Sequence, residues 1–101
     1  MRGTFSKIFG NSPRIRVLEF FLEARGLDYS YGDVYKWKEI SRTTAYFLFD
    51  QLKNERYIVF TRRLGNKNLY KLNEKNGEVK ILINCFNDVL KLNLGIKEVS
   101  K

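Results

Sequence analysis

The clearest indication of the fold is the segment SRTTAYFLFDQL, residues 41–52. Ser41 suits a helix N-cap, because its hydroxyl can accept a backbone N–H that the first helical turn leaves unpaired. At about 100° per residue, the segment divides into two faces. One face carries Ala45, Leu48, Phe49 and Leu52, and the other carries Thr43, Tyr46, Phe47 and Asp50. The pattern therefore predicts a helix that packs on one side and presents hydroxyl groups and aromatic rings on the other.

The presented face has the chemistry that the base edges of DNA require. Base edges offer hydrogen-bonding atoms and the thymine methyl group, so short polar and apolar side chains both find partners there. The predicted base or phosphate contacts are Ser41, Arg42, Thr43, Thr44, Tyr46 and Phe47. Arg42 could pair with guanine through two hydrogen bonds, while Thr43 or Phe47 could meet a thymine methyl. The alternative is that Tyr46 and Phe47 cover a neighbouring element, since aromatic residues at helical spacing are usually core.

The segments that follow predict a β-hairpin with a basic end. The helix should end near Asn54, which tolerates a left-handed cap. YIVFT at 57–61 and LYKL at 69–72 are typical of strands, and the basic segment RRLGNK at 62–67 joins them, with a turn at 65–68. Residues 62–71 contain four cations, Arg62, Arg63, Lys67 and Lys71, and no acid. Phosphate contacts are predicted for Arg62, Arg63, Asn66 and Lys67, with Lys36 and Lys38 as secondary candidates. The alternative is a solvated hairpin whose charges only discourage edge aggregation.

Two helices are predicted before residue 41. Ser12-Pro13 should open the first and Gly26 should close it, with Arg16, Glu19 and Glu23 as its narrow solvent-facing stripe. The pattern Ser30-x-x-Asp33 predicts a capping box for a short helix through Tyr35 and Trp37. Residues 38–40 then separate this helix from the next, with Ile40 as the apolar plug of the turn. Two helices joined by a few residues, the second with an exposed face, make a helix-turn-helix.

The last predicted helix carries more apolar surface than one contact can bury. Asn76 should cap it, and it should run from Gly77 towards Leu94 and stop near Gly95. A main stripe holds Val79, Leu82, Ile83, Phe86, Val89, Leu90 and Leu94, and a flanking stripe holds Ile81, Cys85 and Leu92. The surplus predicts a partner surface, most simply a second copy of the chain. The predicted dimer contacts are Leu82, Cys85, Phe86, Val89 and Leu92. The alternative is that both stripes are buried within the monomer.

The amino-acid composition limits the functions that the chain can have. The 101 residues are expected to form one domain, with an N-terminal arm at 1–11, a core at 12–75, a dimerisation helix at 76–95 and a tail at 96–101. Nineteen Lys and Arg against eleven Asp and Glu give a net charge of +8, which favours a polyanionic partner. The absence of histidine and the single cysteine argue against a zinc site or a Ser-His-Asp arrangement, so we expect no enzymatic activity, metal or cofactor. No signal peptide, membrane-spanning run or small-molecule site is evident, so we expect a cytoplasmic protein with Cys85 as a buried apolar residue.

Four segments carry a family resemblance: IFGNSPRIRVL at 8–18, ISRTT at 40–44, TRRLG at 61–65 and LYKLN at 69–73. With them the chain resembles the small archaeal winged helix-turn-helix transcriptional regulators, relatives of the ArsR/MarR-like class. The resemblance implies a winged-helix fold that is usually dimeric. It also implies that the helix from Ser41 lies in the major groove and that the hairpin near Gly65 lies on the flanking backbone. The chain departs from that pattern at Tyr35, Glu39, Phe47 and Arg56.

The sequence therefore predicts an α+β, mostly helical fold: a winged helix-turn-helix with a two-stranded β-hairpin wing and a C-terminal dimerisation helix. The predicted function is sequence-specific binding of double-stranded DNA by a homodimer that regulates transcription. One alternative is a non-specific nucleoid or architectural protein, for which the net charge alone suffices. Another is a protein-interaction module that uses Tyr46 and Phe47 as anchors.

Overall fold

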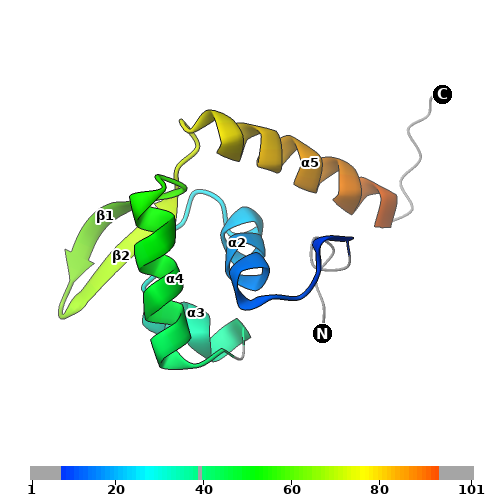
Figure 1. Cartoon of the computed structure of the whole chain (residues 1–101). Helices are drawn as coiled ribbons and strands as arrows, with labels where there is room; N and C mark the ends of the chain where they lie inside the picture. Colours follow the sequence, from blue (N-terminus) through cyan, green and yellow to red (C-terminus); the bar gives the residue numbers. More distant parts are fainter. Residues whose placement is uncertain (1–7, 39, 94–101) are drawn as a thin grey trace.

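The computed structural model describes residues 8–38 and 40–93, with the backbone alone for residues 37, 38 and 93. In chain order the elements are α2 (Pro13–Glu23), α3 (Tyr31–Lys38), α4 (Arg42–Asn54), β1 (Ile58–Leu64), β2 (Lys67–Leu72) and α5 (Gly77–Asn93). Figure 1 shows α2 in the centre, with α3 and α4 on one side, the β1–β2 hairpin beyond α4, and α5 across the other side. The predicted class, a winged helix with a two-stranded hairpin and a C-terminal helix, is confirmed. We call residues 58–72, the hairpin, the wing.

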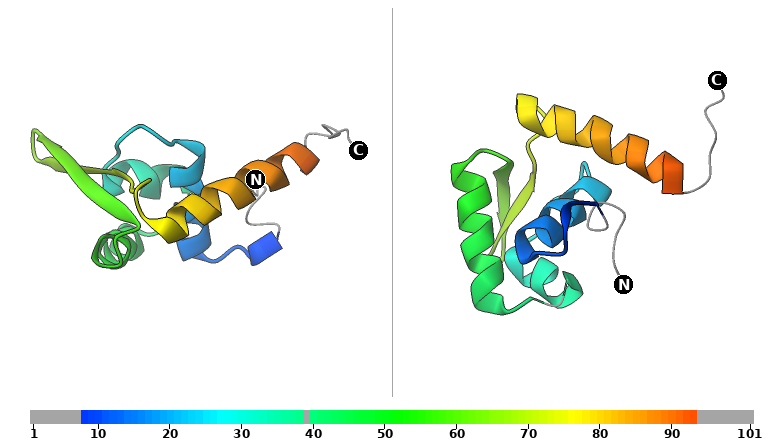
Figure 2. Two further views of the ribbon diagram at one scale, coloured as in Figure 1. Left: turned by 90° about the horizontal axis from the view of Figure 1, so that it is seen from above. Right: turned by 45° about the vertical axis from the view of Figure 1, so that its right-hand side comes forward.

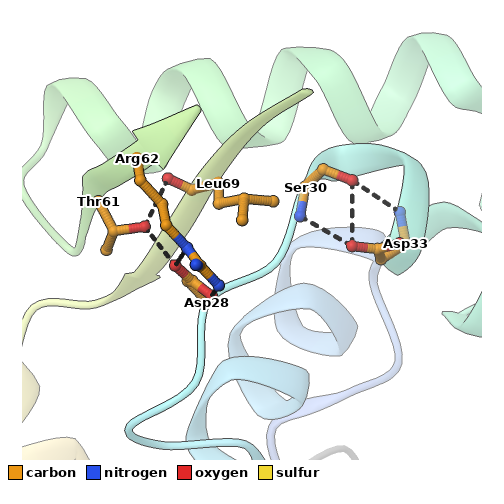
Figure 3. A network of polar contacts seen from close by, with 6 residues as sticks. All are labelled: Asp28, Ser30, Asp33, Thr61, Arg62 and Leu69. Atoms are coloured by element: carbon orange, nitrogen blue, oxygen red, sulfur yellow. Dashed lines mark hydrogen bonds and ion pairs between the residues drawn. The ribbon is translucent and has the colours of Figure 1, made fainter. Parts of the chain in front are cut away.

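The predicted N-terminal caps are present. The Ser12 hydroxyl accepts the Ile15 N–H at 3.2 Å, with Pro13 at the first helical position of α2. The helix ends at Glu23, earlier than predicted, because residues 24–26 form a turn with Gly26 at φ +87°. Ahead of α3, the Ser30 N–H donates to Asp33 Oδ2 at 3.0 Å and the Asp33 N–H donates to Ser30 Oγ at 3.3 Å. These two bonds are the predicted capping box, drawn in Figure 3.

Helix α4 begins and ends where the sequence predicts, but the residue that takes the left-handed conformation after it is not the predicted one. The Ser41 hydroxyl accepts the Thr44 N–H at 3.0 Å, and the last helical residue is Asn54. The left-handed conformation falls on Arg56, at φ +67°, and not on Asn54. For a residue with a side chain this conformation costs about 1–2 kcal/mol. The side-chain amides of Asn73 and Asn76 offset that cost, because they donate to the Arg56 carbonyl oxygen at 2.9 and 3.0 Å.

The wing has longer strands and a shorter turn than predicted. Strand β1 continues to Leu64 and β2 begins at Lys67, so only Gly65 and Asn66 form the turn. Gly65 takes φ +62°, which suits a two-residue hairpin with glycine at its first central position. The antiparallel register shifts between Phe60 and Arg62, so Thr61 is a bulge residue. The predicted basic loop therefore belongs mostly to paired strands.

The core lies where α2, α4, the base of the wing and α5 meet. Its fully buried residues include Val17, Phe21 and Leu22 of α2, Ala45 and Leu52 of α4, Ile58, Leu72 and Val79. Ile40, the predicted plug of the turn, is also buried. The expectation that Glu19 faces solvent is wrong, since its exposure is 1%. Because α3, α4 and α5 lie around α2 (Figure 2), its predicted polar stripe is not fully in water.

Helix α5 divides its apolar residues between the core and solvent. Asn76 caps it as predicted, with its Oδ1 accepting the Glu78 N–H at 2.7 Å and the Val79 N–H at 3.2 Å. Its predicted end near residues 94 and 95 lies outside the described residues, as do residues 1–7 of the predicted arm and the predicted tail. Ile81 and Leu92 are 68% and 78% exposed, so the alternative of complete burial within the monomer is wrong.

Candidate nucleic-acid interface

Helix α4 has the two faces that the sequence predicts. Ala45, Phe49 and Leu52 are buried in the core, while Thr43 is exposed. Tyr46 and Phe47 are 59% and 66% exposed. Tyr46 meets one ring of another element, Tyr31 of α3, in an edge-on contact with centroids 5.6 Å apart. More than half of each presented ring is therefore open to solvent, and neither ring serves only to cover a neighbouring element.

Arg42, the first residue of α4, is held by α3. Its Nη2 donates to the Tyr35 hydroxyl at 2.9 Å, and its guanidinium carbon lies 5.3 Å from the centre of the Tyr35 ring. This hydrogen bond lowers the pKa of Tyr35 and raises the pKa of Arg42 from their usual values. Tyr35 is one of the positions at which the chain departs from the family pattern. No local sequence pattern indicates its pairing with Arg42, although both residues flank the same turn.

Two of the predicted DNA contacts take part in the helix cap. The Ser41 hydroxyl donates to Thr44 Oγ1 at 2.8 Å and also accepts the Thr44 N–H. Ser41 is exposed and Thr44 is half-buried. These hydroxyls therefore fix the start of α4, which leaves Arg42, Thr43, Tyr46 and Phe47 as its presented side chains.

Arg62, next to the bulge of the wing at Thr61, is paired with an acid from another part of the chain. Its Nε donates to Asp28 Oδ2 at 3.0 Å and its Nη2 to Oδ1 at 3.4 Å. The Thr61 hydroxyl lies 2.6 Å from the same Oδ2 and donates to it, as Figure 3 shows. Hydrogen bonds from Thr61 and then Arg62 lower the pKa of Asp28. Residues 62–71 contain no acid, but the expectation that nothing offsets their charge is wrong for Arg62.

The segment that carries Asp28 is itself joined to the wing. Tyr29 and Tyr70 exchange two backbone hydrogen bonds of 2.8 Å each, which form an isolated antiparallel bridge. The link between α2 and α3 thus lies along β2, with the Asp28 carboxylate against the bulge at Thr61. These contacts fix the base of the wing relative to the helices.

The other predicted phosphate contacts lie in exposed positions. Arg63, Asn66 and Lys67 surround the turn of the wing, where Arg63 Nε donates to the Gly65 carbonyl oxygen at 3.0 Å. Lys36 of α3 is exposed as well, whereas the side chain of Lys38 lies outside the described residues. Lys36, Asn66 and Lys67 lie around the same hollow beside α4.

A groove of about 450 Å³ lies between the start of α3, one side of α4 and the end of the wing. We call it the α4–wing groove. Its lining is Ser30, Tyr31, Gly32, Tyr35 and Lys36, then Arg42, Tyr46, Phe49, Asp50 and Lys53, then Asn66, Lys67, Asn68 and Tyr70. It brings together five predicted site residues, Lys36, Arg42, Tyr46, Asn66 and Lys67, but its lining does not include Thr43, Phe47, Arg62 or Arg63.

The groove also contains residues outside the set predicted from the sequence. Lys53 lies on the same side of α4 as Arg42, Tyr46 and Phe49, a helical spacing that could have identified it. Its Nζ lies 3.6 Å from Asp50 Oδ1. The presented carboxylate, which would repel phosphate by itself, therefore has a basic neighbour.

The predicted dimer contacts on α5 differ in how much of each side chain is exposed. Phe86 is only 4% exposed and belongs to the core, so little of its side chain is open to a second copy of the chain. Leu82, Cys85 and Val89 are half-buried, and Leu92 is exposed.

Across residues 8–38 and 40–93, no helix is both long and apolar enough to cross a membrane, and no group of three acidic or cysteine side chains could hold a metal ion.

Three solved structures have a similar fold. Reduced HlyU from Vibrio cholerae N16961 is 19% identical over 85% of this chain and 84% of its own, with a TM-score of 0.62. Mb0332 from Mycobacterium bovis is 17% identical over 97% and 85%, with a TM-score of 0.60. It is described as a homodimeric winged helix-turn-helix DNA-binding domain of a possible ArsR-family transcriptional regulator. Rv0081 from M. tuberculosis is 22% identical over 89% and 88%, with a TM-score of 0.58. No protein-family model and no curated protein matches the chain.

Proposed function

We propose that the chain is a sequence-specific double-stranded DNA-binding transcriptional regulator that acts in the cytoplasm as a homodimer. The observation that carries this proposal is the division of α4 into a buried face and an exposed face with Arg42, Thr43, Tyr46 and Phe47. An α-helix fits the major groove, where these side-chain types find base-edge partners. The similarity of the fold to the DNA-binding domain from M. bovis supports the same function.

The proposed contacts divide into two kinds. Arg42, Thr43 and Tyr46 contact bases or adjacent phosphates from the major groove, and Arg42 pairs with guanine through its planar guanidinium. Arg63 and Lys67 of the wing contact the flanking backbone and supply affinity that does not depend on sequence. Arg62 is reassigned from phosphate contact to positioning of the wing, because Asp28 already occupies its guanidinium.

The proposed homodimer uses α5. Ile81 and Leu92 leave apolar surface in solvent on this helix, and Leu82, Cys85 and Val89 border it. A second copy would bury that surface, and the two α4 helices would then meet half-sites about one helical turn apart. Binding of this kind regulates transcription most simply by covering a promoter.

Selection of bound duplexes from a random library tests the function. We expect a consensus with two-fold symmetry, and an affinity for the selected duplex at least about 1,000-fold above that for a scrambled control at physiological salt. Sedimentation of the protein alone should give a dimer that Leu92→Glu dissociates. Binding without sequence enrichment would favour an architectural protein, and no duplex binding would favour a protein-interaction module.

A further inference from the structure

The α4–wing groove concentrates positive charge from three separate elements. Lys36 comes from α3, Arg42 and Lys53 come from α4, and Lys67 comes from the wing. The one carboxylate in the lining, Asp50, lies 3.6 Å from the Lys53 Nζ. Four cations against one acid around a concave surface favour a polyanionic occupant, since the walls focus the field into the groove.

Aromatic rings are the second component of the groove. Phe49 is buried in the core, 6.4 Å from the Tyr31 ring and 5.7 Å from the Tyr70 ring, measured between ring centres. Tyr31 in turn makes the edge-on contact with Tyr46, at an angle of 79° between the ring planes. These contacts hold the Tyr46 ring at the groove while most of its surface stays in solvent. A ring held in place in this way loses little conformational entropy when a ligand stacks on it.

Cations beside an exposed ring fit an unpaired strand better than a duplex. In a duplex the bases stack on one another and present only their edges, so a protein ring cannot reach a base face. An unpaired strand can place its phosphates on lysines and its base faces on aromatic side chains together. We propose that the α4–wing groove binds single-stranded DNA, with phosphates on Lys36, Lys53 and Lys67 and a base stacked on Tyr46. This site goes beyond the proposed duplex function, but the two share Arg42, Tyr46 and Lys67, so the two ligands compete.

The ring contact is tested with fluorescently labelled oligothymidylate of about 12 nucleotides, a length within the range that single-strand sites cover. Fluorescence anisotropy should show saturable binding by the full chain. Tyr46→Ala should weaken this binding about tenfold, whereas Tyr46→Phe, which keeps the ring, should stay within about twofold. Phe60→Ala is the matched control, because Phe60 of β1 is also more than half exposed but neither lines the groove nor belongs to the proposed duplex contacts. It should leave the affinity unchanged, and circular dichroism should show all three variants folded.

The charge contact is tested with a matched pair of lysine substitutions, one inside the groove and one outside it. Lys53→Gln should weaken oligothymidylate binding and lower its salt slope by about 0.7. Lys80→Gln removes an equally charged, exposed side chain on α5, outside the groove, and should change the slope little. Unlabelled oligothymidylate should also displace a labelled duplex from the wild-type protein.

The outcomes separate this proposal from the duplex function. Duplex binding without saturable oligothymidylate binding would overturn the groove proposal and leave the duplex function intact. Equal losses for Tyr46→Ala and Phe60→Ala, or for Lys53→Gln and Lys80→Gln, would also overturn it. Oligothymidylate binding that depends on Tyr46 and Lys53, in a protein that binds no duplex, would support the groove and overturn the duplex function.

Discussion

Arg42 at the start of α4 and Arg62 beside the bulge of the wing each bind a residue of another segment, but the two partners differ in charge. Arg62 meets the Asp28 carboxylate, so a negative charge stands 3.0 Å from its Nε. Arg42 donates to the neutral hydroxyl of Tyr35 at 2.9 Å and lies against its ring. A position on a basic surface therefore does not by itself make an arginine a phosphate ligand, because the partner it already has determines how much of its charge is available.

The two pairs also differ in what they position. The Asp28 carboxylate binds both Thr61 and Arg62, beside the backbone bridge between Tyr29 and Tyr70. The Asp28 carboxylate offsets the positive charge that Arg62 would otherwise offer to a phosphate. Tyr35, in contrast, orients a guanidinium that keeps its full charge and further donors for a base. We therefore expect substitutions at the two sites to affect different quantities, namely sequence preference at Arg42 and wing geometry at Arg62.

The largest effect should come from Arg42→Ala. Loss of the two hydrogen bonds to guanine should weaken binding to the selected duplex by tenfold or more, while binding to a scrambled duplex falls only by about threefold. Paired titrations of both duplexes at one salt concentration measure the ratio. If both duplexes lose affinity by the same factor, Arg42 contacts phosphate and the comparison with Arg62 loses its basis.

Lys67→Ala should have a smaller effect that is uniform across sequences. Removal of one phosphate contact should weaken every duplex by about threefold and lower the salt slope by about 1. Arg62→Ala serves as the contrast, because its charge is already paired, and its salt slope should stay close to that of the wild type. A slope for Arg62→Ala as low as that of Lys67→Ala would show that Arg62 does bind phosphate.

Asp28→Asn should increase affinity, which is the reverse of the other substitutions. The neutral amide keeps the shape of the carboxylate but removes the negative charge that offsets Arg62. Affinity for scrambled duplex should rise by about twofold to threefold, with a salt slope about 1 larger. The double variant with Arg62→Ala should lose this gain. A gain that persists in the double variant would mean that it does not act through Arg62.

Tyr35→Phe should give a modest loss confined to the selected duplex. The ring remains beside the guanidinium, but the hydroxyl that accepts from Arg42 Nη2 is removed. We expect affinity for the selected duplex to fall by about twofold, and no change with a scrambled duplex. In the Arg42→Ala background the same substitution should have no further effect, as a double-mutant cycle would show. Additive losses would place Tyr35 in direct contact with DNA.

Features that depend on neighbouring residues could be predicted from the sequence. Ser12, Ser41 and Asn76 cap their helices as expected, because a side-chain oxygen reaches backbone groups two or three residues ahead wherever a helix starts. The two faces of α4 follow from its helical period in the same way. The Ser30–Asp33 capping box also involves only one turn of chain.

Features that depend on distant partners could not be predicted. The pairing of Arg62 with Asp28 requires the link after α2 to lie along β2, which no local pattern indicates. The burial of Glu19 follows from the packing of other elements around α2, whereas its helical position alone suggested solvent. The bulge at Thr61 shifts the register of the wing, and the α4–wing groove exists only because three elements converge.

The smallest effect should be a pH dependence of stability that arises from Asp28. Its pKa is lowered in the folded chain, first by Thr61 and then by Arg62, so its ionised form favours folding. The contribution is therefore fully present above the ordinary carboxyl pKa and is lost as the pH falls through the lowered folded pKa. Thermal melts of wild type and Asp28→Asn between about pH 6 and pH 2 measure it. The difference between their melting temperatures should shrink towards the acidic end, because both chains then carry a neutral group beside Arg62. A difference that is constant over this range would show that the Asp28 carboxylate contributes nothing through its charge, and that only the shape of the side chain holds the wing.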